Sequence, residues 1–151
     1  MSQLEASHLA LVSSRDVSQA MSELIRGRRG EVALELFTLV QHAEHFSAKD
    51  KMFLYSSAIN ACAKTKQPQR AVDLLSEMSR LGLQPNAVAY NAAISACEKV
   101  SKWEVALKLL DKMRDRGVQA NTISYSAAIS ACEKAGKWEV RSEERRVGKD
   151  A

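Results

Sequence analysis

The sequence predicts an all-α fold, an α-α superhelix in which helical hairpins stack as successive units of an internal repeat. Several residues recur at a fixed interval of 35 positions, and a period of this length is typical of solenoid proteins. The chain has only six Gly and two Pro in 151 residues, and Ala, Leu, Glu and Lys fill the long stretches between them. Because these four residues lose little entropy in a helix, the composition favours helices as well.

The repeat is defined by four sets of three identical residues, each set spaced by 35 positions. The sets are Tyr55, Tyr90 and Tyr125; Ile59, Ile94 and Ile129; Cys62, Cys97 and Cys132; and Lys64, Lys99 and Lys134. Further identical pairs keep the same phase, among them Leu74 with Leu109 and Met78 with Met113. The pattern divides the chain into two complete units, residues 52–86 and 87–121, and a partial third unit, residues 122–140.

The signals of two helices are clearest in the second complete unit. Asn86 is a good N-cap, and Ala87 to about Lys99 follows without a helix breaker, which predicts the first helix of the unit. Ser101-Lys102-Trp103-Glu104 has the spacing of a capping box, with serine at the N-cap and glutamate three positions later. We therefore expect the second helix to start there and to end at Gly117.

The preceding unit has the same form. Pro68 suits the first turn of its second helix, where the missing N–H costs little, and Gly82 suits the end of that helix. One hairpin cannot bury both of its apolar faces, so the units must stack on each other. Small residues that let helices approach closely recur in the first helices of the next two units, at Ala92, Ala93, Ala127 and Ala128.

Residues 1–51 carry weaker signs of the repeat. Met21 to Arg26 and Ala33 to Phe37 resemble parts of the two helices of a unit, but they lie closer together than their counterparts in the later units. We interpret residues 1–51 as a degenerate N-terminal capping repeat. The first residues contain Glu5 and no arginine before Arg15, so they predict neither an organelle transit peptide nor a secretory signal.

The repeat pattern stops abruptly after Val140. Residues 141–151 form a charged tail that no repeat position predicts, and the run from Arg141 to Lys149 resembles the translation of a common sequencing adaptor. One interpretation is that the reading frame runs from an exon into adaptor sequence, and the alternative is a natural charged tail. Resequencing the transcript beyond the codon of Val140 separates the two, because recovery of the same codons from independent templates contradicts an adaptor origin.

No motif for catalysis or metal binding is recognisable in the sequence. Cys62, Cys97 and Cys132 occur once per unit within apolar stretches, which predicts small core residues and neither a disulfide framework nor a metal site. His42 and His45 lack a third ligand, so they predict solvated surface. A Gly-rich phosphate loop, a nucleophile motif and an acidic cluster for a catalytic metal are missing. We therefore expect no enzymatic activity, metal, cofactor or small-molecule substrate. Since no apolar run approaches the roughly 18 residues that span a bilayer, we also expect no membrane partner.

The second complete unit resembles the repeats of the pentatricopeptide-repeat family. Val88 to Ile94, Ala106 to Leu110, Met113 and Gly117 match the pattern of that family nearly position for position, and the unit before them repeats it. The resemblance implies a right-handed superhelix of hairpins that binds single-stranded RNA at about one base per repeat. It also implies a role in the RNA metabolism of mitochondria or chloroplasts.

In this family the residue after the tyrosine of the first helix and the last residue of the unit together read one base. The pairs carried over by the resemblance are Ser56 with Asn86 and Asn91 with Asn121, and Ser126 leads the third unit. The resemblance implies adenine for the first pair, a pyrimidine for the second and a purine opposite Ser126. Hydroxyl and amide groups donate or accept hydrogen bonds along a base edge, so these residue types suit the role.

The same resemblance implies two further rows of contacts with RNA. Apolar residues two positions before each tyrosine would sandwich the bases between adjacent units; they are Phe53, Val88 and Ile123. Lysines at the end of each first helix would form a ladder along the phosphate backbone; they are Lys64, Lys99 and Lys134. The net charge of +4 permits such an anionic partner without requiring one.

Each of these signals also has a purely structural interpretation. Asn86 and Asn121 are good N-caps, and a lysine near a helix C-terminus is favoured by the helix dipole. Trp103 and Trp138 open second helices, and we assign them to packing or to an outer surface. The alternative function is a protein-interaction scaffold, because the groove of a helical-repeat protein also holds peptides. The phase of the polar pairs favours RNA over a protein partner.

Overall fold

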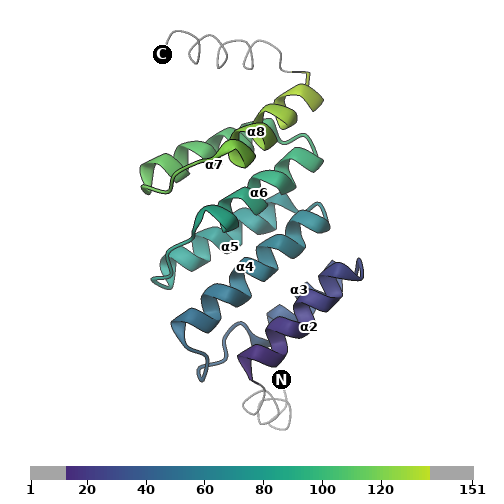
Figure 1. The fold of residues 1–151 in the computed structure, drawn as a ribbon, viewed down its shortest axis with the longest axis vertical. Helices are drawn as coiled ribbons and strands as arrows, with labels where there is room; N and C mark the ends of the chain where they lie inside the picture. The colour runs from purple at the N-terminus through teal and green to yellow at the C-terminus, as the bar shows by residue number, and fades with distance from the viewer. Residues whose placement is uncertain (1–12, 137–151) are drawn as a thin grey trace.

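A computed structural model of the chain describes residues 13–136, and these residues form helices and turns without any strand (Figure 1). The helices are α2 (Ser14–Arg26), α3 (Gly30–Val40), α4 (Ala48–Lys64), α5 (Pro68–Arg80), α6 (Ala87–Lys99), α7 (Trp103–Asp115) and α8 (Thr122–Lys134). They stack in chain order along the long axis of the molecule. The predicted all-α superhelix is confirmed.

The helices alternate between two kinds of position in the stack. α2 with α3, α4 with α5, and α6 with α7 form hairpins, and α8 opens the next unit. Each first helix contacts the first helix of the next unit, so α2, α4, α6 and α8 form one continuous layer. The second helices α3, α5 and α7 pack against the first helices on either side of them. The contacts therefore run between neighbours along the stack, as in other solenoids.

Buried alanines recur at equivalent positions of the first helices. Ala58, Ala93 and Ala128 occupy the same position of α4, α6 and α8, and all three are fully buried. Ala92 and Ala127 are partly buried against the same core. Because alanine has no side chain beyond Cβ, its burial at these positions leaves room for neighbouring helices to approach closely. The structure thus buries the small residues, and their role in close approach stays a prediction.

The three cysteines are free thiols that lie in the core. Cys62, Cys97 and Cys132 have no solvent exposure and form no disulfide. Burial raises the pKa of the Cys62 and Cys97 thiols to about 11, because a thiolate loses its hydration in this environment. They are small core residues, as predicted from their spacing.

The turn between the two helices of a unit has one geometry throughout. Its middle residue is left-handed in every case, with φ of 61° at Arg28, 59° at Lys66 and 58° at Ser101. In the last of these turns, the N–H of Lys102 donates to the carbonyl oxygen of Cys97 at 2.9 Å. This is the Schellman arrangement, which satisfies the last carbonyl groups of the first helix.

The capping box predicted at Ser101-Lys102-Trp103-Glu104 is wrong. The turn that ends α6 needs residue 101 in the left-handed conformation, so α7 begins at Trp103 and Lys102 occupies its N-cap. No side chain caps α7. The spacing of the four residues suggested the box. In the structure Ser101 lies one position before the N-cap of α7 and belongs to the turn that ends α6.

The other predicted helix ends are confirmed. The side chain of Asn86 caps α6 by accepting a hydrogen bond from the N–H of Ala89 at 3.0 Å. Pro68 is the first residue of α5. Gly82 and Gly117 follow α5 and α7 with φ of 77° and 72°, a conformation that favours glycine.

Residues 13–46 contain a helical hairpin, α2 and α3, that stacks on α4. α4 begins at Ala48, where Ser47 and Asp50 form a reciprocal capping box. It has 17 residues, whereas α6 has 13, so the extra turn at its start lies within the segment 1–51. The division at residue 52 therefore separates sequence repeats and cuts through a helix.

The predictions for the tryptophans, the histidines and the two ends of the chain concern partly described and partly undescribed residues. Trp103 is half-buried and packs against the core, and His42 and His45 are exposed. Trp138, the tail 141–151 and the segment discussed as a targeting signal lie outside residues 13–136. Within that range, no helix is both long enough and apolar enough to cross a membrane.

Candidate nucleic-acid interface

Three large apolar side chains lie exposed on the layer of first helices. Phe53, Val88 and Ile123 occupy the same position of α4, α6 and α8, and they are 63%, 70% and 63% exposed. We refer to these three residues as the apolar row. Two positions after its residues in α4 and α6, Tyr55 and Tyr90 are buried and anchor those helices in the core. The local pattern therefore holds the apolar row out of the core in each unit.

The tyrosine of the third unit differs from the other two. Tyr125 is 54% exposed, whereas Tyr55 and Tyr90 are each 1% exposed. The ring of Tyr55 packs edge-on against Phe37 of α3, with the ring centroids 5.0 Å apart. The chain beyond residue 136 lies outside the described range.

The polar residues predicted to read bases lie beside the apolar row. Ser56 and Asn91 are half-buried and Ser126 is exposed, each directly after the tyrosine of its helix. Asn86 and Asn121 are exposed N-caps of α6 and α8, so the structural interpretation of these two residues is also correct. Capping uses one amide oxygen of each and leaves the amide nitrogen for other partners.

The structure joins the second predicted pair by a direct hydrogen bond. The Nδ2 of Asn91 donates to the Oδ1 of Asn121 at 3.2 Å. Ser124, which is fully buried, connects the two: its backbone N–H donates to Asn121 Oδ1 at 3.1 Å, and its hydroxyl donates to Asn91 Oδ1. Ser56 and Asn86, both within the described range, share no such bond. The sequence analysis did not identify Ser124.

Lys99, the second lysine of the predicted ladder, is held by an internal contact. Its Nζ donates to the carbonyl oxygen of Ala63 at 2.9 Å. Desolvation lowers the pKa of Lys99, and the nearby cation Lys64 lowers it further.

Lys134, the third lysine of the ladder, forms an ion pair across the unit boundary. Its Nζ lies 2.5 Å from the Oε1 of Glu98, which also accepts a hydrogen bond from Ser130 at 3.0 Å. The hydrogen bond from Lys134 is the largest of the effects that lower the pKa of Glu98. Lys64 is exposed. The ladder exists as a row of cations, and two of its three members already have protein partners.

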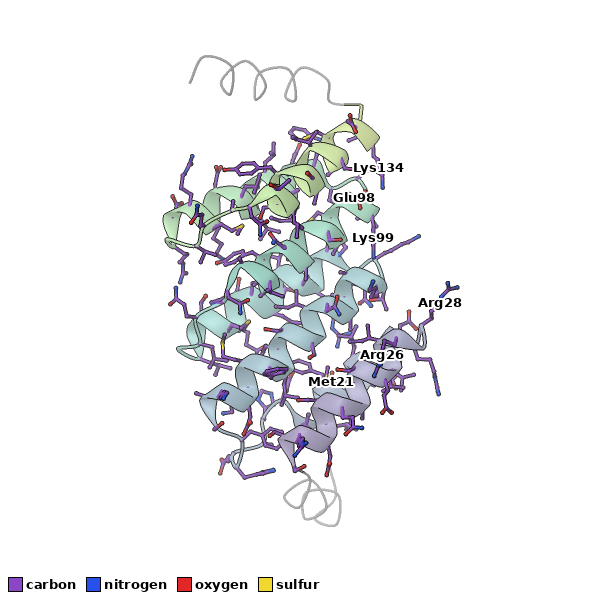
Figure 2. All side chains as sticks on the ribbon, in the orientation of Figure 1. Met21, Arg26, Arg28, Glu98, Lys99 and Lys134 are labelled. Atoms are coloured by element: carbon purple, nitrogen blue, oxygen red, sulfur yellow. The ribbon has the colours of Figure 1, made fainter. Side chains whose placement is uncertain are left out.

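Two further cations that the sequence analysis missed extend this row. Arg26 ends α2 at the position that Lys64 occupies in α4, and Arg28 takes the left-handed turn position of Lys66. Figure 2 shows Arg26, Arg28, Lys99 and Lys134 along one edge of the molecule. The period of 35 did not reveal them, because Arg26 and Arg28 each lie 38 positions before their equivalents, Lys64 and Lys66.

No group of histidine, cysteine, aspartate and glutamate within residues 13–136 is arranged to hold a metal ion. The candidate site consists instead of exposed apolar, amide and hydroxyl groups along one layer of helices. Such groups can stack on flat rings and donate or accept hydrogen bonds.

A family model described as the PPR repeat family matches residues 51–99 and 85–134, which together span more than half of the chain. The chain belongs to the pentatricopeptide-repeat family. No curated protein matches the chain. The family assignment agrees with the resemblance seen in the repeat residues.

Two solved structures of the pentatricopeptide repeat protein PPR10 are similar to this pentatricopeptide-repeat chain. Both are crystal structures in complex with an 18-nt psaJ RNA element, and in one of them three cysteines are replaced by serine. Each has 19% sequence identity and a TM-score of 0.50, and the match covers 93% of this chain and 26% of PPR10. The chain thus spans about a quarter of PPR10, and the likeness establishes the fold of the pentatricopeptide-repeat superhelix.

Proposed function

We propose that this pentatricopeptide-repeat chain binds single-stranded RNA along the layer formed by its first helices, with about one base per unit. The observation that carries the proposal is the apolar row, Phe53, Val88 and Ile123, which remains 63–70% exposed at the same position of three units. Exposed apolar side chains that recur in phase indicate a repetitive apolar ligand. Successive bases of a single strand have this property, since each presents a flat ring.

The arrangement of the row supports slots for single bases. A base inserted between Phe53 and Val88, or between Val88 and Ile123, would contact one apolar side chain on each face. Stacking on an aromatic residue contributes roughly 1–3 kcal/mol per base, and Val or Ile contributes less because an aliphatic side chain lacks a π face. We therefore expect weak binding by this chain alone, since association must also overcome a loss of several kcal/mol of translational and rotational freedom.

Polar groups beside the slots support a preference among bases. We propose that Ser56 with Asn86 reads adenine, that Asn91 with Asn121 reads a pyrimidine, and that Ser126 leads a site for a purine. Asn86 and Asn121 use their oxygens as helix caps, so they are expected to face the bases with their amide nitrogens. Binding would involve no catalysis and no cofactor, and organelle transcripts are the proposed targets.

We propose that phosphate contacts contribute less to RNA affinity than three available lysines would. Lys64 is exposed and available, whereas Lys99 and Lys134 would have to leave Ala63 and Glu98. For single-stranded RNA the slope of log affinity against log salt is about −0.7 per neutralised phosphate. We therefore expect a shallow salt dependence for this chain.

The experiment that tests the proposal removes the apolar row. A variant with Phe53→Ser, Val88→Ser and Ile123→Ser is compared with the native chain for binding of a fluorescent RNA that contains adenine followed by a pyrimidine, with DNA of the same sequence alongside. The matched control, Leu39→Ser with Leu81→Ser, removes two apolar side chains of similar exposure from α3 and from the end of α5. All five positions are exposed, so the fold should be kept.

We expect the row variant to lose at least tenfold in RNA affinity and the control variant to bind as the native chain does. Equal binding by both variants would contradict the proposal. If the native chain binds no RNA and instead binds an extended peptide that the row variant releases, the layer is a protein-interaction surface. That outcome would support the scaffold alternative.

A further inference from the structure

Ser124 is the only buried polar residue in the core formed by residues 13–136, and it lies between the two members of the second base-reading pair. We infer that Ser124 is a positioning residue that fixes the orientation of both amides, Asn91 and Asn121, and thereby sets the base preference of that unit. This inference rests on the proposed function, since it assigns a determinant of specificity within the same site.

The orientation of the pair starts from the helix cap. The backbone N–H of Ser124 donates to the Oδ1 of Asn121 at 3.1 Å, so the oxygen of that amide must face the helix and its Nδ2 must face outward. The Nδ2 of Asn91 donates to the same oxygen at 3.2 Å. Because the Nδ2 of Asn91 points toward Asn121, the Oδ1 of Asn91 is left to accept a hydrogen bond from another group.

The hydroxyl of Ser124 completes the arrangement. It donates to the Oδ1 of Asn91, and it accepts a hydrogen bond from the backbone N–H of Asn121 at 3.2 Å. A second acceptor for the hydroxyl, Asn121 Oδ1, lies at 3.2 Å but already accepts two hydrogen bonds. Because a serine hydroxyl has one proton, we assign that proton to Asn91. A rotation of the Asn91 amide by half a turn would break this bond and oppose two oxygens.

The equivalent position of the other units shows what the hydroxyl adds. Leu54 and Ala89 occupy in α4 and α6 the place that Ser124 occupies in α8. Ala89 donates its backbone N–H to Asn86 at 3.0 Å, as Ser124 does to Asn121, but it has no hydroxyl to give to Ser56. In the first pair, therefore, only the helix cap is present. In the second pair the cap and the serine hydroxyl together hold both amides in one orientation, and we call this arrangement the lock.

A locked amide presents one fixed pattern of donors and acceptors. Asn121 offers its Nδ2 hydrogens, and Asn91 offers one remaining hydrogen and one remaining lone pair. An amide that rotates freely can match either a donor or an acceptor on a base edge, so it discriminates poorly. The lock thus converts two adaptable side chains into a selective site.

The test compares Ser124→Ala with Ala89→Ser in the full chain. Alanine occurs naturally at the equivalent position of α6, so we expect Ser124→Ala to fold, and the thermal unfolding of both variants checks this. Affinities are measured for RNAs in which either the first or the second of two adjacent bases is varied through all four identities. The side-chain amide signals of Asn86, Asn91 and Asn121 are followed by NMR relaxation without RNA.

We expect Ser124→Ala to reduce the preference at the second base about threefold to tenfold, the range that corresponds to one neutral hydrogen bond. Preference at the first base should not change, and Ala89→Ser should sharpen it. Without RNA, the side-chain amide of Asn91 should be more mobile in Ser124→Ala than in the native chain. The mobility of the Asn86 amide should not change. A general loss of affinity at both bases would show a merely structural role for Ser124.

The two readouts separate the failure of the inference from the failure of the proposed function. Unchanged mobility of Asn91 in Ser124→Ala overturns the lock whether or not RNA binds. A native chain that binds none of the RNAs overturns the proposed function, and the amide mobility then decides alone whether Ser124 orients the pair. An unchanged base preference together with increased mobility of Asn91 overturns the link between orientation and specificity.

Discussion

At the scale of single residues, Glu98 holds one of the cations at the boundary between the second and third units in an ion pair. It binds Lys134 and Ser130 of α8 from its place on α6. Its equivalent in the first complete unit is Ala63, which offers only a backbone carbonyl, and that carbonyl accepts from Lys99. If RNA binds as proposed, this acidic side chain competes with a phosphate for the last lysine of the ladder.

Replacing Glu98 by glutamine should increase both the affinity for RNA and its salt dependence. The neutral amide holds Lys134 less strongly, so the ammonium group can bind a phosphate. The slope of log affinity against log salt should steepen by about 0.7 for one additional phosphate. The matched control is Glu104→Gln on the exposed surface of α7, which changes the net charge equally. A slope that steepens equally in both variants would contradict a specific release of Lys134.

The same pair predicts a dependence of stability on pH. The pKa of Glu98 is lowered in the folded chain, first by the hydrogen bond from Lys134, from an ordinary value of 4.5. The stabilisation is therefore fully present above pH 4.5 and is lost as the pH falls through the lower folded-state value. The difference in unfolding temperature between the native chain and Glu98→Gln should shrink between pH 5 and pH 3. A constant difference across this range would show that ionisation of Glu98 contributes nothing.

At the scale of helices and turns, a left-handed residue follows each described helix except α3, and glycine occupies some of these positions but not others. Gly117 has φ of 72°, and a Cβ added there would meet nothing within 4 Å. Ser101 has φ of 58° and carries a Cβ in the same conformation. Both residues are left-handed, but only Ser101 carries a Cβ, which this conformation disfavours.

Gly117→Ala should destabilise the chain and Ser101→Gly should stabilise it. A left-handed conformation costs an L-residue roughly 1–2 kcal/mol, so we expect a loss of this size for the first change. For the second we expect a gain of at most about 1 kcal/mol, because glycine also gains entropy in the unfolded chain. Urea unfolding with an unchanged m-value measures both. Two changes of the same sign would contradict the assignment of strain to these turns.

The helices illustrate which local features a sequence pattern can predict. α6 begins and ends where Asn86 and the absence of breakers indicated, because a cap and a helix-favouring run act within a few residues. The start of α7 was mispredicted, because Ser101 fits a capping box by spacing while the preceding helix needs it in the turn. The equivalence of Arg26 with Lys64 was missed because the two helix ends are 38 positions apart, three more than the repeat period.

At the scale of the whole molecule, the repeat period was sufficient to predict the stack of hairpins, and the family resemblance singled out the residues of the apolar row. The period did not predict the contacts between units. Lys99 with Ala63 and Lys134 with Glu98 join residues 36 positions apart, and Asn91 with Ser124 joins residues 33 apart. Such contacts depend on how one hairpin packs on the next. The repeat period alone does not determine that packing. The partners of the predicted site residues therefore needed the structure.

The close packing of the first helices predicts that enlarging a buried alanine will destabilise the stack. Ala93→Leu places extra atoms where α6 meets its neighbouring first helices, and overpacking of this kind typically costs about 1–3 kcal/mol. Ala48→Leu, on the exposed start of α4, makes the same chemical change on the surface and should have little effect. Urea unfolding followed by circular dichroism compares the two. Equal stability of both variants would contradict tight packing in this layer.

The central claim, that RNA lies along the layer of first helices, is tested most directly by NMR. The isotope-labelled full chain is titrated with a short RNA of adenine followed by a pyrimidine, and the shifted signals are mapped on the structure. We predict that the shifts cluster at Phe53, Val88 and Ile123 and at the side-chain amides of Asn86 and Asn121. Shifts confined to α3, α5 and α7, or none at saturating RNA, would contradict the claim.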